Sequence, residues 1–330
     1  MKQLTRNVRI IGTGSFAPET VYTNEFLESI SPTSAQWVLE NLGIRERRVA
    51  AEGQTTSDLA AQAALKAIEG AGLTPDDIDL IIVATATPDR LAPSTAAIVQ
   101  DKIKAYNSVA FDLAAVCSGF LFSMSTAAQF IATGIYNNAL VIGADTFSKI
   151  IDWSRRDCVF FGDGAGAAVL THTDSDSGFL AFRLYTDGRG KWNFTIPGGG
   201  SEYPLSHENV DAGQRYFQMV GKAVYETGVK VLPKSINQVL HDTGLTINDV
   251  DYMIPHQPSI RILKDTADII GLPFEKVLTN MDRYANTSGG TIPILLDEAN
   301  QAGKLKPGNL ILFAAVGAGW TYGASLIRWS

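Results

Sequence analysis

The chain has 330 residues, of which 45% are hydrophobic and 18% charged, and its formal net charge at pH 7 is −7. This composition is typical of a globular protein with a large core, and the negative charge argues against nucleic acid or an anionic membrane surface as a principal partner. Because there are only two cysteines, Cys117 and Cys158, neither a disulfide scaffold nor a cysteine-built metal site is expected.

The chain carries no recognisable targeting or membrane-spanning segment. The N-terminal stretch has basic residues but no apolar run long enough for a signal peptide. The longest apolar run, residues 111–133, is interrupted by serine, threonine and glutamine, so it predicts a buried core helix and not a membrane span. A soluble cytoplasmic protein is therefore expected.

Strand and helix patterns alternate along the first half of the chain. In chain order, hydrophobic periodicity and turn residues predict a strand at 8–12, a helix at 23–41, an exposed basic connection at 43–51, a helix at 58–71 capped by Ser57, strands at 78–84 and 109–113 around a helix at 94–104, a helix starting at Ser118, and a strand at 139–143. This alternation predicts an α/β protein with largely parallel sheets.

The second half of the chain repeats the first. The segment GLTPDDIDLIIVAT starting at Gly72 is matched by GLTINDVDYMIPHQ starting at Gly244, 172 residues later. A second pair, FDLAAVC and MDRYANT, places Asp112 and Asp282 170 residues apart. Two such pairs at nearly the same offset indicate internal duplication, with halves at 1–173 and 174–330 stacked as helix–sheet–helix–sheet–helix layers.

The duplication places three polar residues at equivalent strand ends. Cys117 becomes equivalent to Thr287, and His256 becomes equivalent to Ala84 at the carboxyl end of its strand. Ligands of α/β sheets bind at the carboxyl ends of strands. Cys117, His256 and Asn286 are therefore expected to converge on one central site.

Cys117 lies where a predicted strand turns into a predicted helix. The unpaired N–H groups and the dipole of a helix N-terminus favour a thiolate over a thiol, so a nucleophilic cysteine is one interpretation. Packing as a small buried hydrophobic residue is the other. His256 and Asn286 are equally ambiguous alone, because a histidine at a strand end and an asparagine before a Thr-Ser-Gly-Gly turn are often structural.

Taken together, these residues resemble the β-ketoacyl-acyl-carrier-protein synthase III family of the thiolase superfamily. The resemblance extends over nearly the whole chain, through GIRERR (43–48), DLAAVCSGF (112–120), FGDGAGAAVL (161–170), PHQPSIRI (255–262), NTSGGTIP (286–293) and GAGWTYGASLIRW (317–329). It implies a thiolase-like five-layer αβαβα fold and a catalytic triad of Cys117, His256 and Asn286.

The resemblance also implies an activity. An acyl group passes from acyl-CoA to Cys117, with the backbone N–H groups of Cys117 and Ala318 as the oxyanion hole. Decarboxylative Claisen condensation with a malonyl or related β-keto-acid thioester follows, and His256 and Asn286 stabilise the enolate. No cofactor and no metal is implied. In place of Asn286, thiolase-type enzymes use a second cysteine and hydroxymethylglutaryl-CoA synthases use a glutamate. This chain has neither residue at that position.

The substrate entrance departs from the family pattern. The resemblance implies that Trp37 and Arg155 hold the CoA adenine and phosphates, with Ser259 and Gly221 beside the pantetheine, while a second family arginine is Asn41 here. Arg261 is implied to dock a carrier protein. Asp268, Ile269 and Glu226 replace family lysines, although Lys222 and Lys264 lie nearby, so either malonyl-ACP or malonyl-CoA could be the extender.

The acyl end of the site is expected to be enlarged. Relatives that prime with acetyl-CoA have a bulky aromatic residue, reaching across a homodimer interface, where this chain has Ala92 beside Leu91. Medium-length or branched acyl primers are therefore expected, unless Leu91 or Phe120 fills the space. Residues 198–200 resemble the family's flexible flap over the acyl pocket. Cys158 and FGDGAG are interpreted as structural, because the glycine-rich turn lacks a phosphate-loop lysine.

Two other functions remain open from the sequence. One is an acyltransferase on the same fold that passes the acyl group to a small-molecule acceptor without decarboxylation. The other is a non-enzymatic partner subunit, which the presence of Cys117, His256 and Asn286 argues against. The condensing enzyme, in fatty-acid initiation or in a specialised pathway, is the leading hypothesis.

Overall fold

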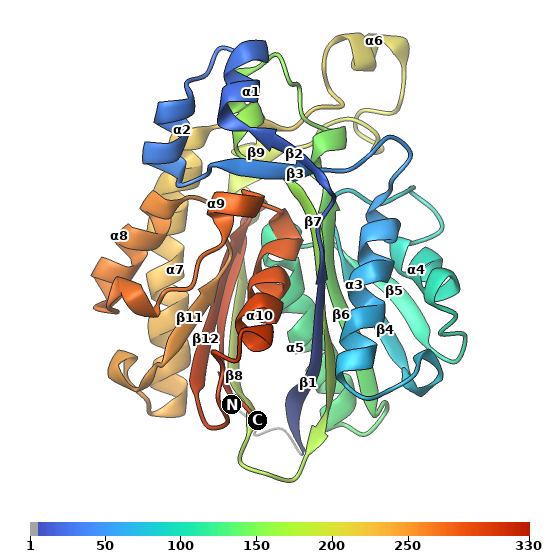
Figure 1. Ribbon diagram of the computed structural model, residues 1–330, viewed down its shortest axis with the longest axis vertical. Coiled ribbons are helices and arrows are strands. Elements are labelled where there is room, and N and C mark those ends of the chain that lie inside the picture. The colour runs from blue at the N-terminus through green and yellow to red at the C-terminus, as the bar shows by residue number, and fades with distance from the viewer. Residues whose placement is uncertain (1–5) are drawn as a thin grey trace.

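The computed structural model describes residues 6–330 as two β-sheets with helices between them and on both outer faces (Figure 1). The expectation that no signal peptide is present concerns residues 1–5 in part, and these lie outside the described residues. The first sheet has the strand order β1 (Asn7–Phe16), β7 (Asp163–Thr173), β6 (Asn138–Thr146), β4 (Leu80–Ala84) and β5 (Val109–Leu113). The second has the order β11 (Tyr252–Pro255), β12 (Leu310–Gly317), β13 (Thr321–Arg328) and β8 (Gly178–Thr186).

Six helices complete the layers. Helices α5 (Gly119–Ala132) and α10 (Thr291–Gln301) lie between the sheets, α3 (Thr56–Gly70) and α4 (Thr95–Ile103) cover the first sheet, and α7 (Gly221–Thr243) and α8 (Ile260–Ile270) cover the second (Figure 1). Side chains from both sheets and both middle helices, among them Phe120, Met124, Leu296 and Phe313, form one continuous core. The predicted helix–sheet–helix–sheet–helix layering is confirmed.

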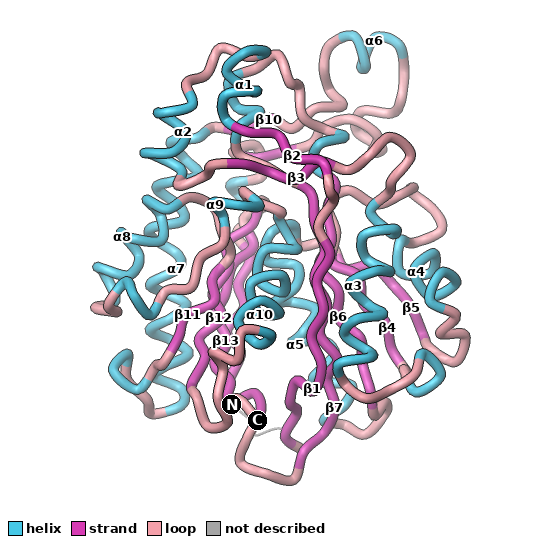
Figure 2. The backbone as a smooth tube through the Cα atoms, in the orientation of Figure 1, coloured by secondary structure: helices cyan, strands magenta, loops and turns pink. Residues whose placement is uncertain are grey.

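The remaining short elements gather at one end of the layers (Figures 1 and 2). These are β2 (Thr20–Thr23), α1 (Asn24–Ile30), α2 (Ala35–Leu42), β3 (Glu46–Val49), β9 (Phe194–Thr195), α6 (His207–Asp211), β10 (Gln218–Met219) and α9 (Met281–Tyr284). No helix among residues 6–330 is both long and apolar enough to cross a lipid bilayer.

The prediction of largely parallel sheets is wrong. Four of the seven strand pairings in the two main sheets are antiparallel: β1 with β7, β6 with β7, β12 with β13, and β13 with β8. The connection from β12 to β13 is only three residues long, and so short a connection can join antiparallel strands but not parallel ones. Strand β1 also extends to Phe16, beyond the predicted end at residue 12.

Two predicted helix boundaries are also corrected. The single helix expected at 23–41 is two helices, α1 and α2, because Pro32 disfavours helical backbone in the residue before it, and Ser34 caps a new start by accepting from the Trp37 N–H at 3.3 Å. Helix α3 is capped by Thr55 and not by Ser57. The Thr55 N–H donates to the Asp58 carboxylate at 2.8 Å, which completes a capping box.

The duplication is visible in the backbone at an offset of 172. Thr74 with Asp77, and Thr246 with Asp249, form identical capping boxes before β4 and β11. The short 3₁₀ helices η2 (Val116–Ser118) and η8 (Ser288–Gly290) also correspond at this offset, and Val116 and Ser288 both have positive φ angles, of 47° and 51°. Cys117 therefore corresponds to Gly289, which corrects the predicted match to Thr287.

The misleading second match has a structural cause. Asp112 lies in strand β5, whereas Asp282 lies in helix α9. The two segments therefore have similar sequences but different secondary structures. The first sheet draws its strands from residues 7–173 and the second from residues 178–328. We propose on this basis that the two halves are 1–173 and 174–330.

Arg47 overturns the expectation that residues 43–51 form an exposed connection. Its side chain is fully buried in β3, and its guanidinium donates to the carbonyl oxygens of Tyr22 at 3.1 Å and Val159 at 3.1 Å, and to Asn24 Oδ1 at 3.0 Å. Burial lowers the pKa of Arg47 to about 10, so the group stays charged at neutral pH. One side chain thus ties together β2, α1 and the segment before β7.

Replacing Arg47 by methionine is expected to lower the free energy of unfolding by about 3 kcal/mol, because three buried acceptors lose their donor. Urea denaturation measures this loss. Arg45→Met is the matched control, since Arg45 is exposed, and it is expected to change stability by less than about 0.5 kcal/mol. Equal losses in the two variants would contradict the role assigned to Arg47.

Candidate active site

A cavity of about 320 Å³ brings together residues from both halves of the chain. Most of its wall is apolar. Eight residues predicted from the sequence line it: Trp37, Cys117, Gly221, His256, Ser259, Arg261, Asn286 and Ala318. The predicted convergence of Cys117, His256 and Asn286 therefore occurs in the folded chain.

Cys117 lies in η2, between the edge strand β5 and the first turn of α5. The preceding residue, Val116, has the positive φ of 47° that turns the chain sharply at this point. Cys117 is only 8% exposed. Strand β5 is partly exposed along its length.

The expected thiolate character of Cys117 is not present in the unliganded protein. Burial, with a smaller contribution from the Asp145 carboxylate, raises the pKa of the Cys117 thiol to about 12. The free-energy cost of removing a thiolate from water at this position exceeds the stabilisation that the helix N-terminus provides. The thiol is therefore protonated at neutral pH, and a nucleophilic role requires a nearby base.

His256 can serve as that base. It follows the last residue of β11, where its backbone N–H donates to the Ala314 carbonyl of β12 at 2.8 Å. Burial lowers the pKa of His256 to about 3, so the imidazole is neutral. Its Nδ1 lies 2.8 Å from Thr291 Oγ1, and the Thr291 hydroxyl donates to the Ser288 carbonyl at 3.0 Å. Since a hydroxyl has one proton, Nδ1 carries the imidazole proton and Nε2 carries the lone pair.

Asn286 is oriented as a hydrogen-bond donor. Its Oδ1 accepts from the Ser288 N–H at 2.8 Å, which leaves the Nδ2 amide protons for the cavity. The segment is held by backbone hydrogen bonds in both directions, from Asn286 to Phe160 and from Gly162 to Asn286, each 3.1 Å long. The Asn286 side-chain amide therefore cannot rotate without losing the buried hydrogen bond that it accepts from the Ser288 N–H.

Backbone strain is concentrated around these three side chains. Among the described residues other than glycine, four have positive φ angles: Lys104, Val116, Ala285 and Ser288. Val116 precedes Cys117, Ala285 precedes Asn286, and Ser288 holds the Asn286 amide. Strain of this kind persists mainly where a precise side-chain arrangement is needed.

The backbone beside Cys117 is built for close approach. A Cβ atom on Gly317, at the end of β12, would lie 3.0 Å from the Cys117 nitrogen. The backbone at Gly317, which precedes Ala318, therefore passes close to the backbone at Cys117. Ala318 does not have a positive φ, whereas Gly319 does, at 128°. Alanine is therefore compatible with the backbone at position 318.

The predicted pairing of Trp37 with Arg155 needs correction. Arg155 does not line the cavity; its guanidinium forms an ion pair with Asp157 at 2.6 Å. Arg156, the first residue of the 3₁₀ helix Arg156–Val159, stacks over the Trp37 ring at 4.7 Å. Asn41 lines the cavity and donates to the Trp37 carbonyl at 3.0 Å. The same 3₁₀ helix contains Cys158.

At the cavity mouth, Arg261 stacks over the Tyr225 ring at 4.8 Å, and the Tyr225 hydroxyl donates to Asp265. Ser259 caps α8, where its hydroxyl accepts from the Ile262 N–H at 3.4 Å. Gly221 is the first residue of α7. All three predicted binding residues thus begin or border helices that open onto the cavity.

A second cavity, of about 800 Å³, shares Phe194 and Ala318 with the first. Residues 198–200, the predicted flap, line it together with Leu91. Ala92 is exposed and lines neither cavity, and Leu91 is 85% exposed. Phe120 is fully buried in the core between the sheets. In this one chain, none of these three side chains closes the space beside Cys117.

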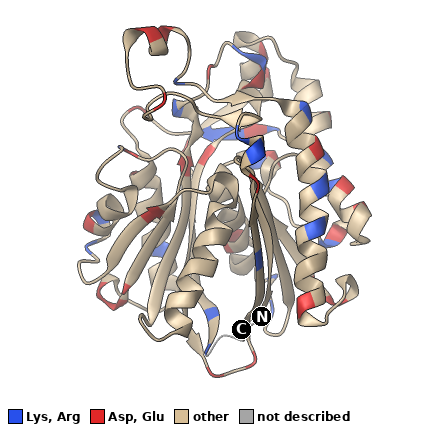
Figure 3. Ribbon diagram, turned by 180° about the vertical axis from the view of Figure 1, so that it is seen from behind, with Lys and Arg blue, Asp and Glu red and all other residues tan. Residues whose placement is uncertain are grey.

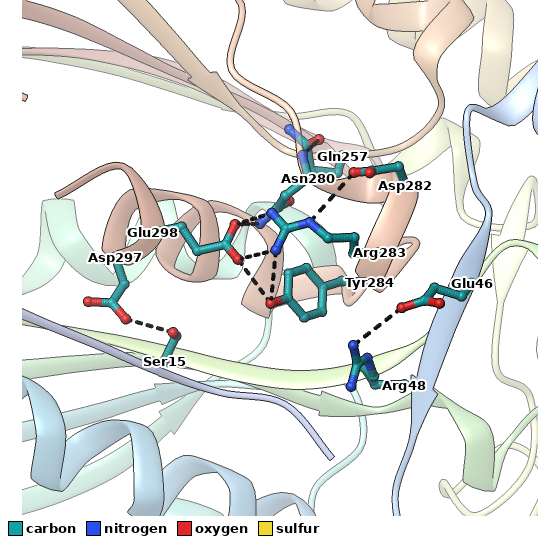
Figure 4. Close-up of polar contacts among 10 residues, drawn as sticks. All are labelled: Ser15, Glu46, Arg48, Gln257, Asn280, Asp282, Arg283, Tyr284, Asp297 and Glu298. Atoms are coloured by element: carbon teal, nitrogen blue, oxygen red, sulfur yellow. Dashed lines mark hydrogen bonds and ion pairs between the residues drawn. The ribbon is translucent and has the colours of Figure 1, made fainter. Parts of the chain in front are cut away.

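A hydrogen-bond chain supports the strand end that carries His256 (Figure 4). Gln257 donates to the Pro255 carbonyl at 2.9 Å and accepts from the Asn280 N–H at 3.3 Å. The Asn280 amide donates to Glu298 on α10 at 2.8 Å, and Arg283 binds the same carboxylate at 2.8 Å. The helix that supplies Thr291 is thereby tied to the loop after His256.

Three polar residues of the site were not predicted: Asp145, Ser288 and Thr291. Asp145 is fully buried at the end of β6, a polar residue closing an apolar strand as His256 does. Ser288 and Thr291 lie in the NTSGGTIP block, but nothing in the letters shows which hydroxyl faces which side chain. Within the described range, no three His, Cys, Asp or Glu side chains are placed so that they could hold a metal ion.

Comparisons with known proteins agree with this architecture. Family models described as 3-oxoacyl-[acyl-carrier-protein (ACP)] synthase III match residues 111–188, and as its C-terminal part, residues 240–329. The chain is 46% identical to the β-ketoacyl-[acyl-carrier-protein] synthase III of Desulfitobacterium hafniense over 325 residues, 98% of each protein.

Solved structures match equally well. The 3-oxoacyl-[acyl-carrier-protein] synthase III of Aquifex aeolicus is 41% identical, with a TM-score of 0.90 over 98% of this chain and 100% of that one. A priming β-ketosynthase of a polyketide biosynthetic pathway is 28% identical, with a TM-score of 0.91 over 98% and 97%. The fold is therefore thiolase-like, as predicted, and the chain belongs to the β-ketoacyl-[acyl-carrier-protein] synthase III family of condensing acyltransferases.

Proposed function

We propose that the protein transfers an acyl group from acyl-CoA to Cys117 and then condenses it, with loss of carbon dioxide, with a malonyl or related β-keto-acid thioester. The observation that carries this proposal is the orientation of Asn286, whose amide is held as a donor beside Cys117 and His256. Plain acyl transfer forms no enolate and does not need that donor. The reaction would start fatty-acid synthesis or serve a specialised pathway.

Acyl transfer begins with the Cys117 proton. The neutral His256 accepts it on Nε2, and the sulfur attacks the thioester carbonyl of the acyl-CoA. The oxyanion that forms is stabilised by the N–H groups of Cys117 and Ala318. When the carbonyl re-forms, coenzyme A leaves as a thiolate and takes the proton back from His256. The acyl group is then held on Cys117 as a thioester.

Condensation uses the same histidine as a donor. Because a hydroxyl both donates and accepts, Thr291 supports either tautomer of His256, and the tautomer with Nε2–H can donate to the malonyl thioester oxygen. The Asn286 amide donates to the same oxygen. Loss of carbon dioxide leaves an enolate, whose carbon attacks the acyl-Cys117 carbonyl. The β-ketoacyl thioester leaves, and the Cys117 thiolate takes up a proton.

The entrance supports a CoA thioester as the acyl donor. The stacked pair of Trp37 and Arg156 offers an aromatic face and a cation for the adenine and phosphates. Helix α7 carries both basic and acidic residues along its length (Figure 3), and Lys222 lies 3.8 Å from Glu226. Arg261 is the basic residue that lines the cavity at this end. Either malonyl-ACP or malonyl-CoA fits this mixed surface. The proposed reaction needs no cofactor or metal and would take place in the cytoplasm.

A homodimer is proposed from the free edge of β5. This strand ends the first sheet, and no other strand of residues 6–330 pairs with its outer edge. Val109, at its start, is 49% exposed. Pairing with a second copy would cover this edge and carry Leu91 and Ala92 toward the partner.

A malonyl-dependence assay tests the proposed function. Incubation with acyl-CoA and malonyl thioester is expected to release carbon dioxide and form a β-ketoacyl thioester, and omission of the malonyl thioester is expected to stop turnover at acyl-Cys117. Continued transfer of the acyl group to an alcohol or amine without malonyl thioester would instead establish the non-decarboxylating acyltransferase.

The preference for acyl length is expected to rise from acetyl-CoA to hexanoyl-CoA, because Ala92 leaves room where an aromatic ring would fill the partner's pocket. Each additional buried methylene is worth roughly 0.8 kcal/mol, or about fourfold in kcat/KM. Ala92→Phe should reverse the order, and Ala92→Ser, which adds little bulk, should not. A clear acetyl preference that Ala92→Phe leaves unchanged would contradict the pocket argument.

A further inference from the structure

The Ser288 hydroxyl is the most unusual polar group in the site. Ser288 is fully buried, and its Oγ forms no hydrogen bond of normal geometry with any residue between 6 and 330. The residue also has a φ of 51°, in the left-handed region. A buried unpaired hydroxyl and a strained backbone both cost stability, so together they point to a role in function.

Two groups of opposite character lie beside this hydroxyl. Helix η8, which carries Ser288, packs against η2 with Cys117 and against β6 with Asp145. The adjacent Gly289 N–H donates to Asp145 Oδ2 at 3.0 Å. Burial raises the pKa of both the Cys117 thiol and the Asp145 carboxyl, and the nearby Ser288 side chain lowers each of them in part.

The two oxygens of Asp145 are unequally occupied. Oδ1 accepts from the hydroxyls of Thr85 and Thr87 and from the N–H groups of Ala86 and Thr87, at 2.7–3.1 Å. Oδ2 accepts only from Gly289 among the described residues. Oδ2 therefore retains a lone pair that no described residue occupies. A rotating hydroxyl has two acceptors to choose from, this oxygen and the Cys117 sulfur.

We propose that Ser288 is a positioning residue for Cys117, and that its unpaired hydroxyl turns toward the Cys117 sulfur and donates to it when the thiol loses its proton. The proton of the thiol goes to Nε2 of His256, and the Ser288 proton stays on its own oxygen. This assignment rests on the proposed function only for the identity of the proton acceptor. It explains how a thiolate can form near a buried carboxylate.

Few other charges can influence this sulfur. The titratable groups that face Cys117 in the described chain are Asp145 from β6 and His256 after β11. The elements η8, β12 and α5, which also surround it, contain no acidic, basic or histidine residue. The hydroxyl of Ser288 is therefore the side chain best placed to offset the negative charge of Asp145.

Alkylation of Cys117 by iodoacetamide tests this assignment without any substrate. In a Cys158→Ala background, which leaves one thiol, Ser288→Ala and Ser288→Gly are each expected to slow alkylation about tenfold at every pH from 7 to 9, since a hydrogen bond to the thiolate is lost. Both variants remove an atom beside the sulfur, so a change in access alone would speed the reaction. Slowing is therefore diagnostic of a less stable thiolate.

The pair of variants separates the hydroxyl from the strained backbone. Glycine relieves the positive φ and alanine does not, so equal slowing in both assigns the effect to the hydroxyl. Unchanged alkylation in either folded variant, or slowing in Ser288→Ala that disappears in Ser288→Gly, would overturn the proposal. Slowed alkylation with no malonyl-dependent condensation would refute the proposed function and leave the role of Ser288 standing.

Discussion

Replacement of Cys117 by serine or alanine is expected to abolish the acyl-enzyme and to reduce condensation by about four orders of magnitude or more. Serine nearly preserves the shape of cysteine, but its hydroxyl proton is far less acidic than a thiol proton. The neutral His256 therefore removes a serine proton far less readily than the Cys117 proton. The acyl adduct is measured by intact mass after incubation with hexanoyl-CoA, and turnover by carbon dioxide release.

The second thiol of the chain supplies the control. Cys158 is also buried, but it donates to Ser31 Oγ at 3.3 Å and does not line the cavity. Cys158→Ala is expected to retain the full acyl adduct and turnover. A covalent acyl adduct in Cys117→Ala would show that the nucleophile is elsewhere.

Replacement of Asn286 by alanine is expected to slow condensation about 10²- to 10³-fold while leaving acylation of Cys117 nearly unchanged. In the proposed reaction the amide donates to the enolate oxygen, which exists only after decarboxylation begins. Loss of one such donor costs about 2.7–4 kcal/mol in the transition state. Single-turnover acylation and malonyl-dependent carbon dioxide release, measured on the same preparation, separate the two steps.

Asn41→Ala is the matched control for this variant. Asn41 lines the same cavity, but its amide donates to the Trp37 carbonyl near the entrance. Its loss is expected to raise KM for acyl-CoA and leave the rate of decarboxylation unchanged. If Asn286→Ala slowed acylation as much as condensation, the proposal that Asn286 acts only in the condensation step, while His256 acts in both steps, would be wrong.

Local pattern was sufficient for most of the architecture. Apolar runs and turn residues were sufficient to locate β4, β5 and α4, because buried strands and amphipathic helices each have a characteristic pattern of hydrophobic residues. Internal similarity located the duplication, since both halves bury the same faces. The predicted equivalent of Cys117 was wrong by two residues, because β5 and α9 have similar sequences but different backbone conformations.

Burial was harder to read from the letters. The segment around Arg47 is rich in arginine, which predicts an exposed segment. The Arg47 side chain is nevertheless buried and donates to three acceptors from distant segments. The pKa of Cys117 was misjudged for a related reason. A helix start is visible in sequence, whereas the cost of removing a thiolate from water depends on what covers it.

The sequence by itself determined which family the chain resembles, which residues should meet at the strand ends, and that two similar halves must stack around a common core. These properties follow from residue types at fixed spacing. Only the tertiary structure decided that Arg156 and not Arg155 faces Trp37, that Thr291 contacts Nδ1 of His256, and that the segment of Ser288 packs against those of Cys117 and Asp145. Each of these depends on side-chain direction and on contacts between segments that are often far apart in the chain, and no local pattern encodes them.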